Sequence, residues 1–265
     1  MPDIHPTALI DPEVELAPDV YIGPGCVLRG PVKIGPGCKL HGNAYLHGPL
    51  TMGANNRVYP FACLGFAAQD LKYDPAKLGA GLVIGDDNVF REGFTAHRAT
   101  LDKPTRIGNH NYCMATSHVG HDSVLADYVT LVNGALIAGH VEIADRAVIG
   151  GAGGVHQFCR VGRLAMTAGG AVITRDLPPF CTVHYSKRVG SLNLVGMRRA
   201  GLRQSVNPMR RAFDLFFRSG HSVPKALELI ESEVAGDPAV AEFVQFIRTT
   251  KRGITRYGGA AGEEE

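Results

Sequence analysis

Aliphatic residues return at every sixth position along most of this chain. An unbroken first run has eleven members, and a second run follows two interruptions. A period of six fits neither an α-helix nor an alternating strand. It predicts a solenoid of triangular coils, three hexads to a coil, with aliphatic side chains filling a narrow interior. The hexad positions are Ile4, Ile10, Leu16, Ile22, Leu28, Ile34, Leu40, Leu46, Met52, Val58 and Leu64, then Ile84, Phe90 and Ala96, and finally Ile107, Cys113, Val119, Leu125, Leu131, Ile137, Ile143, Ile149, Val155, Val161, Thr167 and Ile173.

Glycine often follows the aliphatic residue of a hexad, and a small residue often stands four positions after it. We expect the glycines at the corners of the coil, where a tight bend requires backbone angles that glycine tolerates. The cysteines at small positions are interpreted as small hydrophobic residues rather than disulfide partners. The glycines are Gly23, Gly35, Gly53, Gly65, Gly85, Gly108, Gly120, Gly150 and Gly162, and the cysteines are Cys26, Cys38, Cys113 and Cys159.

The hexad register breaks twice, near residues 66–82 and near residues 98–106. On a solenoid, insertions leave the stack as loops and often form a binding edge. The hexads end after Pro178-Pro179, so we expect the β-helix domain to span residues 1–185 and to carry both loops.

A helical pattern follows in residues 186–256, which we expect to form a separate domain. Helix-start and helix-end residues predict three helices. The glutamate-rich residues 257–265 are expected to be a disordered acidic tail. The predicted helices begin at Asn207-Pro208, after Ser222 and at Asp237-Pro238, and they end near Gly220, Gly236 and Gly253.

Composition and charge exclude several classes of protein. A formal net charge of +2 over 265 residues is not the signature of a nucleic-acid binder. No stretch reaches the roughly 18 apolar residues that a membrane-spanning helix needs, and the first residues lack the apolar region of a signal peptide. We therefore expect a cytoplasmic protein with no nucleic-acid partner and no integral membrane segment.

One region departs from this balance of charge. Between Lys187 and Arg218 there are eight basic residues and a single acid, Asp214. This imbalance favours a site for phosphates or for an acidic protein partner over a merely solvated helix face.

Five of the eleven histidines lie on the coils around the second insertion: His97, His118, His121, His140 and His156. Because one coil takes about 18 residues, His121 and His140 should lie one coil apart and close together. Three interpretations are open from the residues alone: a general base, a zinc site shared between subunits, and a structural role. Asp122 follows His121 directly, and pairing between them requires a corner, because successive strand residues point to opposite faces.

The hexads resemble the left-handed parallel β-helix of the hexapeptide acyltransferases. Several ordered motifs are more specific and cover essentially the whole chain, which is similar to the UDP-N-acetylglucosamine 3-O-acyltransferases of lipid A biosynthesis. The motifs are "IHPTA" (4–8), "QDLKY" (69–73), "AHRAT" (96–100), "HVGHDS" (118–123), "IAGH" (137–140), "GGVHQFCRVG" (153–162) and "RSG" (218–220).

The resemblance implies a mainly β fold, with a left-handed parallel β-helix of hexapeptide repeats followed by a small C-terminal α-helical domain. It also implies a homotrimer whose active sites lie between neighbouring β-helices. The implied reaction transfers a fatty acyl group, often 3-hydroxylated, from acyl carrier protein to the 3-hydroxyl of a nucleotide sugar. No cofactor and no metal are expected.

The same resemblance implies roles for particular residues. His121 would be the general base, with Asp122 beside it and no acyl-enzyme intermediate, and the backbone N–H of Gly139 would help to form an oxyanion hole. Contacts with the nucleotide sugar or the acyl chain are implied for Gln69, Asp70, Lys72, His97, His118, His140, His156, Gln157, Asn193 and Arg199. The region that measures acyl-chain length corresponds to Met166, Ala168, Gly169 and Gly170, where small residues favour a longer channel.

Four departures from the family pattern cluster where substrate contacts are implied, although they leave the base and the oxyanion donor in place. They keep three alternatives open: a changed nucleotide sugar such as one with a 3-amine, a different acyl donor, and a diverged non-catalytic paralogue. A metal-dependent hydratase is a further alternative from a different class of protein. The departures are Ala99 in place of glycine, Thr116-Ser117 before His118, the stretch Val183–Lys187, and Val195 in place of an acid.

Overall fold

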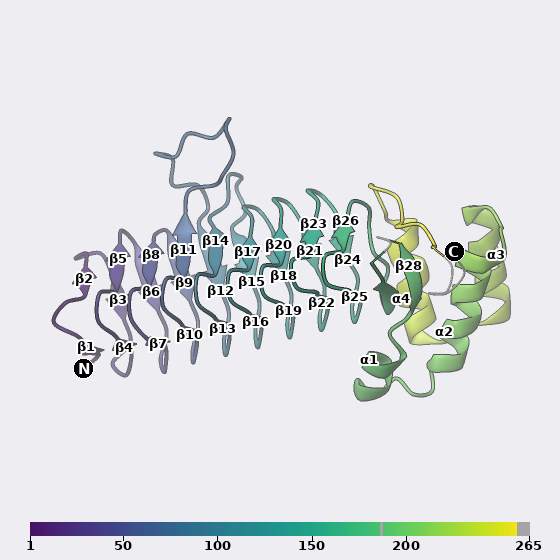
Figure 1. The fold of residues 1–265 in the computed structure, drawn as a ribbon, viewed down its shortest axis with the longest axis horizontal. Helices are drawn as coiled ribbons and strands as arrows, with labels where there is room; N and C mark the ends of the chain where they lie inside the picture. Colours follow the sequence, from purple (N-terminus) through teal and green to yellow (C-terminus); the bar gives the residue numbers. More distant parts are fainter. Residues whose placement is uncertain (186–187, 259–265) are drawn as a thin grey trace.

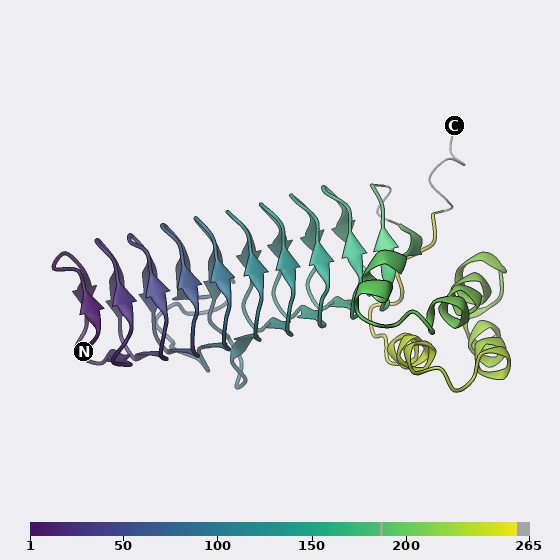
Figure 2. The same cartoon turned by 90° about the horizontal axis from the view of Figure 1, so that it is seen from below.

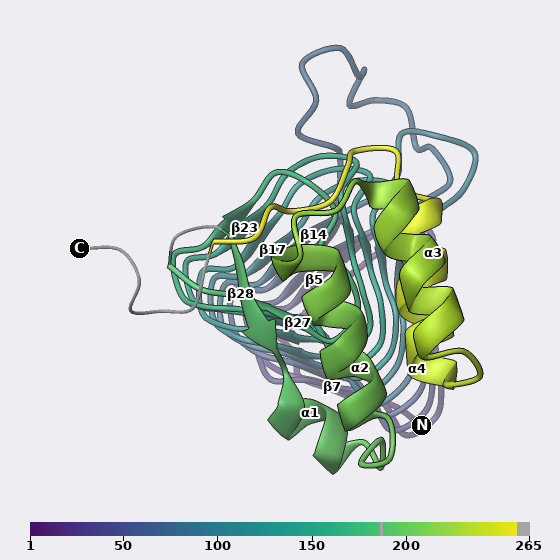
Figure 3. The same cartoon turned by 90° about the vertical axis from the view of Figure 1, so that its right-hand side faces the viewer.

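The computed structural model describes residues 1–185 and 188–258. Its N-terminal part is a solenoid of short strands arranged in three sheets that run along the long axis of the molecule (Figure 1). Seen from the end, the coils have three sides (Figure 3), one for each sheet. A small helical part follows the last coils. The expected fold class, a left-handed parallel β-helix with a C-terminal helical domain, is confirmed.

Each strand of the solenoid pairs in parallel with the next strand of its own sheet, one coil further on. Sheet A contains β1 (Asp3–Ile4), β4 (Tyr21–Ile22), β7 (Lys39–Leu40), β10 (Arg57–Val58), β13 (Val89–Phe90), β16 (Tyr112–Cys113), β19 (Thr130–Leu131), β22 (Val148–Ile149), β25 (Met166–Thr167), β27 (Cys181–Val183) and the antiparallel β28 (Val189–Leu192). Sheet B contains β2 (Leu9–Ile10), β5 (Val27–Arg29), β8 (Tyr45–His47), β11 (Cys63–Phe66), β14 (Thr95–His97), β17 (His118–Val119), β20 (Leu136–Ile137), β23 (Gly154–Val155) and β26 (Val172–Ile173). Sheet C contains β3 (Glu15–Leu16), β6 (Val32–Ile34), β9 (Leu50–Met52), β12 (Leu82–Ile84), β15 (Thr105–Ile107), β18 (Val124–Leu125), β21 (Glu142–Ile143) and β24 (Arg160–Val161).

The hexad residues form the interior of the solenoid, as the period of six predicts. From Ile22 to Ile173 every one of them is at most 2% exposed. Ile4, on the first coil that the structure describes, is 41% exposed. The interior is therefore a continuous apolar column that stacks one coil on the next.

The glycines that follow the hexad residues serve close stacking, and the expected reason, unusual backbone angles, is wrong for most of them. Among the nine, only Gly65 has a positive φ. A Cβ at Gly23 or Gly35 would lie 2.5 or 2.6 Å from a carbonyl oxygen of the next coil, closer than real contacts allow. Other residues make the bends, three positions after the hexad residue, as at Asn43 with φ 47° and Asp122 with φ 59°.

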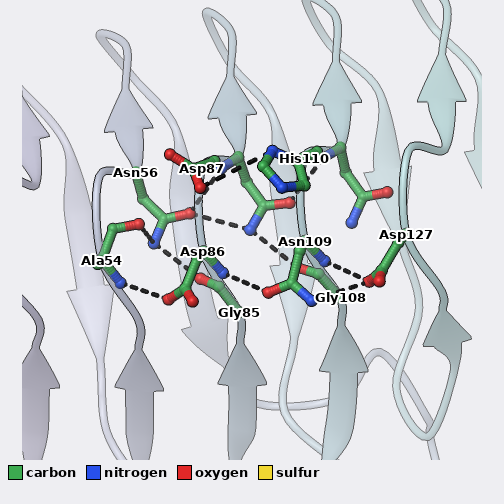
Figure 4. Close-up of polar contacts among 11 residues, drawn as sticks. Ala54, Asn56, Gly85, Asp86, Asp87, Gly108, Asn109, His110 and Asp127 are labelled. Atoms are coloured by element: carbon green, nitrogen blue, oxygen red, sulfur yellow. Dashed lines mark hydrogen bonds and ion pairs between the residues drawn. The ribbon is translucent and has the colours of Figure 1, made fainter.

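An asparagine ladder reinforces the coils from which the insertions leave (Figure 4). Asn56, Asn88 and Asn111 are at most 1% exposed and stand one above the other inside the solenoid. The Oδ1 atoms of Asn56 and Asn88 accept from the backbone N–H of the next asparagine at 2.9 Å, and Asn111 continues the ladder to the N–H of Val129 at 2.7 Å. Buried amides that satisfy one another in this way fix the vertical register of the coils.

Two loops project from the solenoid on the same side (Figures 1 and 3). The longer one joins β11 to β12 and the shorter one joins β14 to β15. An isolated bridge between Gly81 and Ala99 ties their bases together. These are the two insertions where the hexad register breaks.

The helical part contains α1 (Leu194–Arg199), α2 (Val206–Phe213), the π-helical turn η1 (Asp214–Arg218), α3 (Val223–Glu233) and α4 (Pro238–Arg248). The three predicted helices correspond to α2 continued by η1, to α3 and to α4, although α4 ends at Arg248, before the predicted Gly253, and α1 was not predicted. Asp237 caps α4 by accepting from the N–H groups of Ala239 and Val240 at 2.9 and 3.1 Å. In the part of the chain that the structure describes, no helix has the length and apolar character needed to cross a membrane.

The helical part lies beside the last coils (Figure 2), and an ion pair and a hydrogen bond attach it to them. Arg163 contacts Glu242 of α4 through Nη2 and Nε, at 2.5 and 3.0 Å. Arg160 Nε lies 3.1 Å from Asp176, which is 1% exposed and also accepts from Thr250 Oγ1 at 2.7 Å. The segment after α4 is therefore held against the solenoid. The division of the chain at residue 185/186 stays a prediction, and Ser186, Lys187 and residues 259–265 of the expected tail lie outside the described residues.

Candidate active site

The two histidines of the "HVGH" motif lie on different sides of their coil. His118 is the outward residue of β17 on sheet B, and its Nδ1 is 2.7 Å from Thr95 Oγ1 on β14. The chain then turns towards sheet C, and His121 lies in this turn with 6% of its surface exposed. His121 is thus placed at the corner between sheets B and C.

His121 and Asp122 form a direct pair. The Nδ1 of His121 is 2.7 Å from Oδ2 of Asp122, and the positive φ of Asp122 provides the corner that such a pair requires. Because an ionised carboxylate only accepts hydrogen bonds, Nδ1 carries the proton and Nε2 retains its lone pair. His121 therefore has the tautomer that a general base needs.

Asp122 also binds the second insertion. Its carboxylate accepts from the backbone N–H groups of Thr100 and Leu101 at 3.1 and 3.0 Å and from Thr100 Oγ1 at 2.6 Å. Burial by itself raises the pKa of this carboxyl, but the hydrogen bonds from His121, Thr100 and the backbone amides outweigh burial and hold the pKa of Asp122 well below its usual range. The anion is thus fixed in charge and in position, and it orients His121.

His140 lies one coil further on, as the period of the solenoid predicts. Its ring centroid is 5.1 Å from that of His121, with the ring planes at 89°, and its Nε2 is 3.8 Å from Oδ2 of Asp122. On its other side, His140 stacks on Phe158 with centroids 4.7 Å apart. His121, Asp122 and His140 therefore form one cluster at the corner.

Gly139 lies against the free edge of His121. A Cβ at this glycine would lie 2.7 Å from His121 Nε2. Among the hydrogen bonds of the described residues, none is donated by the Gly139 N–H. A backbone donor without a partner beside an imidazole that could act as a base meets the first requirement of an oxyanion hole.

A second histidine pair lies behind the first. The rings of His97 and His118 meet edge to face with centroids 4.9 Å apart, and His97 is 7% exposed. Burial, followed by the proximity of His118, His121 and Arg98, lowers the pKa of His97 to about 4, and burial and His121 lower the pKa of His118. Both rings are therefore neutral at pH 7.

The buried neutral state of His97 makes stability depend on pH. Unfolding restores an ordinary pKa near 6.5, so the stabilisation from neutral His97 is complete above pH 6.5 and is lost as the pH falls towards 4. From pH 7.5 to 5.5 we expect the free energy of unfolding to fall by about 1 kcal/mol more in the native protein than in His97→Gln. Urea titrations at both pH values measure this difference. An equal fall in both proteins would contradict the prediction.

A cleft of about 520 Å³ opens beside the cluster, between the corner and the segment after α4. Asp122, His140 and Phe158 line one side, and Lys251 and Arg252 line the other. A separate cavity of about 390 Å³ lies between α3 and α4 and contains no histidine. Of these two cavities, only the first is lined by residues of the corner cluster.

Other residues with implied substrate contacts lie at greater distance from the cluster. Gln69 and Lys72 are exposed on the longer loop, where Asp70 Oδ1 accepts from the Lys72 N–H at 2.9 Å. His156 and Gln157 are exposed at the corner after β23, and Arg252 Nη2 lies 3.3 Å from His156 Nδ1. The roles of these residues stay predictions.

Asn193 and Arg199 lie at the two ends of α1. Asn193 Oδ1 accepts from the N–H of Gly196, and its Nδ2 donates to the carbonyl of Leu164, both at 2.8 Å. Arg199 is exposed. The side chain of Asn193 thus caps α1 and ties this helix to the solenoid.

The predicted chain-length region lies on another side of the same chain. Met166 is the outward residue of β25 on sheet A and is 39% exposed. Ala168, Gly169 and Gly170 follow it at the corner between sheets A and B, and a Cβ at Gly170 would meet nothing within 4 Å. This surface and His121 therefore face different directions within one chain.

The corner cluster is also the place where a metal ion would fit best. His121, Asp122 and His140 each offer one ligand atom, and these atoms lie within 4.8 Å of one another. Zinc requires its ligand atoms at about 2.0–2.2 Å from a single point, whereas Asp122 already accepts from His121 and from the second insertion. The donor set fits an oriented base better than a closed metal site.

Several residues of the site were missed in the sequence. Thr95 and Thr100 hold His118 and Asp122, Phe158 stacks on His140, and Arg252 faces the corner from the helical part. Strands β14 and β17 pair in a register that places Thr95 beside His118. Counting hexads across the second insertion gives this register only if the length of the loop is known. The position of Arg252 beside the corner could be predicted only with the path of the C-terminal segment.

Comparisons with known proteins show the family of this chain. Residues 176–255 match the family model described as "Udp N-acetylglucosamine O-acyltransferase; Domain 2". The chain is 43% identical to the acyl-[acyl-carrier-protein]–UDP-N-acetylglucosamine O-acyltransferase of Stutzerimonas stutzeri over 96% of this chain and 99% of the relative, and 44% identical to that of Anaeromyxobacter sp. with the same coverage. The UDP-N-acetylglucosamine acyltransferase structure from Francisella novicida superposes with a TM-score of 0.91 at 33% identity, covering 96% of this chain and 94% of that one. With such identity over nearly its whole length, the chain belongs to the UDP-N-acetylglucosamine O-acyltransferase family.

Proposed function

We propose that this protein transfers a fatty acyl group, in its 3-hydroxy form or unsubstituted, from acyl carrier protein to the 3-hydroxyl of UDP-N-acetylglucosamine. This is the first step of lipid A biosynthesis, and we place it in the cytoplasm. The observation that carries the proposal is the His121–Asp122 pair beside the unpartnered Gly139 N–H, in a chain of this family.

The proposed mechanism is a direct acyl transfer. Nε2 of His121 takes the proton of the sugar 3-hydroxyl while its oxygen attacks the thioester carbonyl carbon. The Gly139 N–H stabilises the oxyanion, and Asp122 stabilises the imidazolium that forms. Collapse of the oxyanion breaks the carbon–sulfur bond, and the thiolate of the carrier takes the proton back from Nε2. The products are the acyl ester and the free carrier thiol, and His121 is regenerated.

We propose that the remaining histidines and the loop residues bind the two substrates. His97 and His118 are neutral at pH 7 and offer hydrogen bonds to the sugar without adding charge. Gln69, Asp70 and Lys72 would close over it from the longer loop. His140, His156 and Gln157 line the path towards the basic wall of the cleft, with Arg252 at 3.3 Å from His156. Asn193 and Arg199 would serve a site completed by another chain.

The basic residues around α1 would bind the acidic carrier protein. Arg198 and Arg199 are exposed in the last turn of α1, and Arg203 is exposed soon after it. Lys187, part of the same run, lies outside the described residues. Exposed cations on one side of the helical part accelerate association with an acidic partner.

We propose that three copies assemble through sheet B. Its outward row includes Leu9, Tyr45, Leu136 and Val172, which are 37% to 55% exposed in the single chain. The outward row of sheet C instead includes several charged residues, among them Glu142, and suits solvent. A long apolar strip on a repetitive surface favours another copy of the chain as its partner. His118 lies on the same strip, so assembly would bring a neighbour to the site.

Subunit mixing tests this arrangement. If each site combines His121 of one copy with Arg199 of its neighbour, His121→Ala and Arg199→Glu proteins should each have little activity. Unfolding and refolding them together in equal amounts should restore about a quarter of the native activity, because one site in four then has both residues intact. The measurement is the acyl-transfer rate of the mixed oligomers. No recovery, or a monomer in sedimentation, would contradict the arrangement.

The reaction itself is tested by mass spectrometry of UDP-N-acetylglucosamine incubated with a panel of acyl-carrier-protein thioesters. One acylated product, absent with His121→Ala, is the expected result. A product formed only with a 3-amino nucleotide sugar would assign the alternative substrate to the departures at Ala99, Thr116-Ser117, Val183–Lys187 and Val195. Binding of nucleotide sugar without turnover would indicate a non-catalytic paralogue, and stoichiometric zinc in the purified protein would indicate a hydratase.

A further inference from the structure

Arg98 is a buried cation that the mechanism does not use. It follows His97 at the end of β14, only 1% of it is exposed, and it is the largest fully buried side chain of the chain as described. Within the described residues no carboxylate pairs with it. A buried guanidinium without a counter-ion is costly, and several hydrogen bonds are needed to offset its loss of hydration.

The hydrogen bonds of Arg98 reach the longer loop, its base and, through His47, strand β8 of the preceding coil. Its Nη2 donates to the carbonyls of Pro75 and Lys77 at 2.9 and 3.2 Å. Its Nη1 donates to the carbonyl of Gly65 at 3.2 Å and to Nδ1 of His47 at 2.9 Å. The backbone N–H of Arg98 also donates to the carbonyl of Phe66 at 3.0 Å. One residue thus holds both the beginning and the far side of the loop.

Little else in the described contacts stabilises the loop. Leu71 and Leu78 are 106% and 49% exposed, so the loop has almost no apolar core of its own. Its internal contacts are short-range, such as the Tyr73 hydroxyl donating to the Lys77 carbonyl at 3.2 Å. Because backbone conformational entropy opposes ordering of such a segment, a fork of donors aimed at two separate carbonyls is the main tie.

Arginine suits this position better than any other cation. Its planar group carries five N–H donors in a fixed geometry, whereas lysine offers one compact ammonium. Two nitrogens separated by the width of the guanidinium reach His47 and Gly65 on one side and Pro75 and Lys77 on the other. His47 accepts through Nδ1, and its ring stacks against Phe66 at 5.6 Å between centroids.

We propose that Arg98 is a positioning residue for the nucleotide-sugar site, which holds the loop carrying Gln69, Asp70 and Lys72 against the coil that carries His97. The inference rests on the proposed function, because it assumes that this loop contacts the nucleotide sugar. It adds a residue that touches no substrate but sets the distance between two groups that do. Loss of the tie would leave the base, the oxyanion donor and the carrier site unchanged.

The experiment compares Arg98→Met and Arg98→Lys with the control Arg106→Met, which removes an exposed arginine from the outward face of neighbouring β15. For both Arg98 variants we expect the KM for the nucleotide sugar to rise roughly tenfold or more, while kcat and the KM for the acyl carrier change less than about threefold. The control should match the native protein. A purely structural role would instead lower the melting temperature and leave the KM unchanged, and that outcome would overturn the proposal.

Limited trypsin digestion measures the opening of the loop independently of catalysis. Cleavage after Lys72 and Lys77 should be at least about tenfold faster in Arg98→Met than in the control, since the open state of the loop becomes populated. Added methylguanidinium should restore both the KM and the protection in Arg98→Ala by occupying the vacated site. If the native protein transfers no acyl group, the proposed function fails, whereas equal cleavage of the native and variant loops overturns the role of Arg98 alone.

Discussion

Replacing His121 by alanine should lower kcat by about a thousandfold, which is the usual contribution of a positioned general base. The pair with Asp122 at 2.7 Å fixes the ring and its tautomer, so alanine removes the proton acceptor without another group to replace it. His140, the nearest ring, lies at 5.1 Å between centroids and is turned by 89°. The measurement is the pre-steady-state transfer rate from an acyl carrier thioester to UDP-N-acetylglucosamine.

The matched control is His41→Ala, which removes a histidine whose ring contacts that of Tyr59 at 4.6 Å between centroids, in coils near the N-terminus. It should leave kcat unchanged within about twofold, because surface substitutions away from the site have small effects. A variant that retained more than a tenth of the native kcat would show that another group takes the proton.

The hexad pattern predicted the solenoid because every sixth residue has the same physical task. Each coil buries one residue from each sheet, and the column from Ile22 to Ile173 has no exposed member. The same pattern could not reveal what the glycines do. Gly23 and Gly35 are required by the distance between coils, and this distance is a property of the stack rather than of one hexad.

The asparagine ladder was missed for the same reason. Asn56, Asn88 and Asn111 occupy slots that hold small apolar residues in other coils, and they are separated by an insertion of irregular length. Their partnership appears only when the coils are aligned. The helix α1 was missed because its six residues, which include a glycine and end at Arg199, are too few for a helical period to emerge.

At the site, contacts set by the hexad period were predictable and contacts made by the insertions were not. The adjacency of His121 and Asp122 and the spacing to His140 follow from the solenoid period. The hydrogen bond from Thr100 to Asp122 could be predicted only with the path of the second insertion. The hydrogen bonds of Arg98 could be predicted only with the path of the first insertion. The sequence of a loop without apolar periodicity does not indicate where its residues lie on the solenoid. Neither insertion has such a periodicity.

Gly139→Ala should lower kcat by about a hundredfold while leaving the fold intact. The new methyl would lie 2.7 Å from His121 Nε2, so the ring must move by several tenths of an ångström or more. Displacement of a reacting group on this scale costs about two orders of magnitude in rate. The clash is with a side chain and not with backbone, so the coils need not separate. Transfer kinetics and a melting curve of the same preparation test both parts.

Gly35→Ala distinguishes a glycine required for the stacking of coils from Gly139, which leaves space for the His121 ring. Its Cβ would lie 2.6 Å from the Gly53 carbonyl oxygen, so the backbone of two coils must part, far along the solenoid from His121. We expect a lower melting temperature and an unchanged kcat for each folded molecule, the reverse of Gly139→Ala. If Gly139→Ala were as unstable as Gly35→Ala, its loss of activity would reflect stacking and not His121. If it were stable and fully active, Nε2 could not be the atom that takes the proton, because the added methyl occupies the space in which the sugar hydroxyl must approach it.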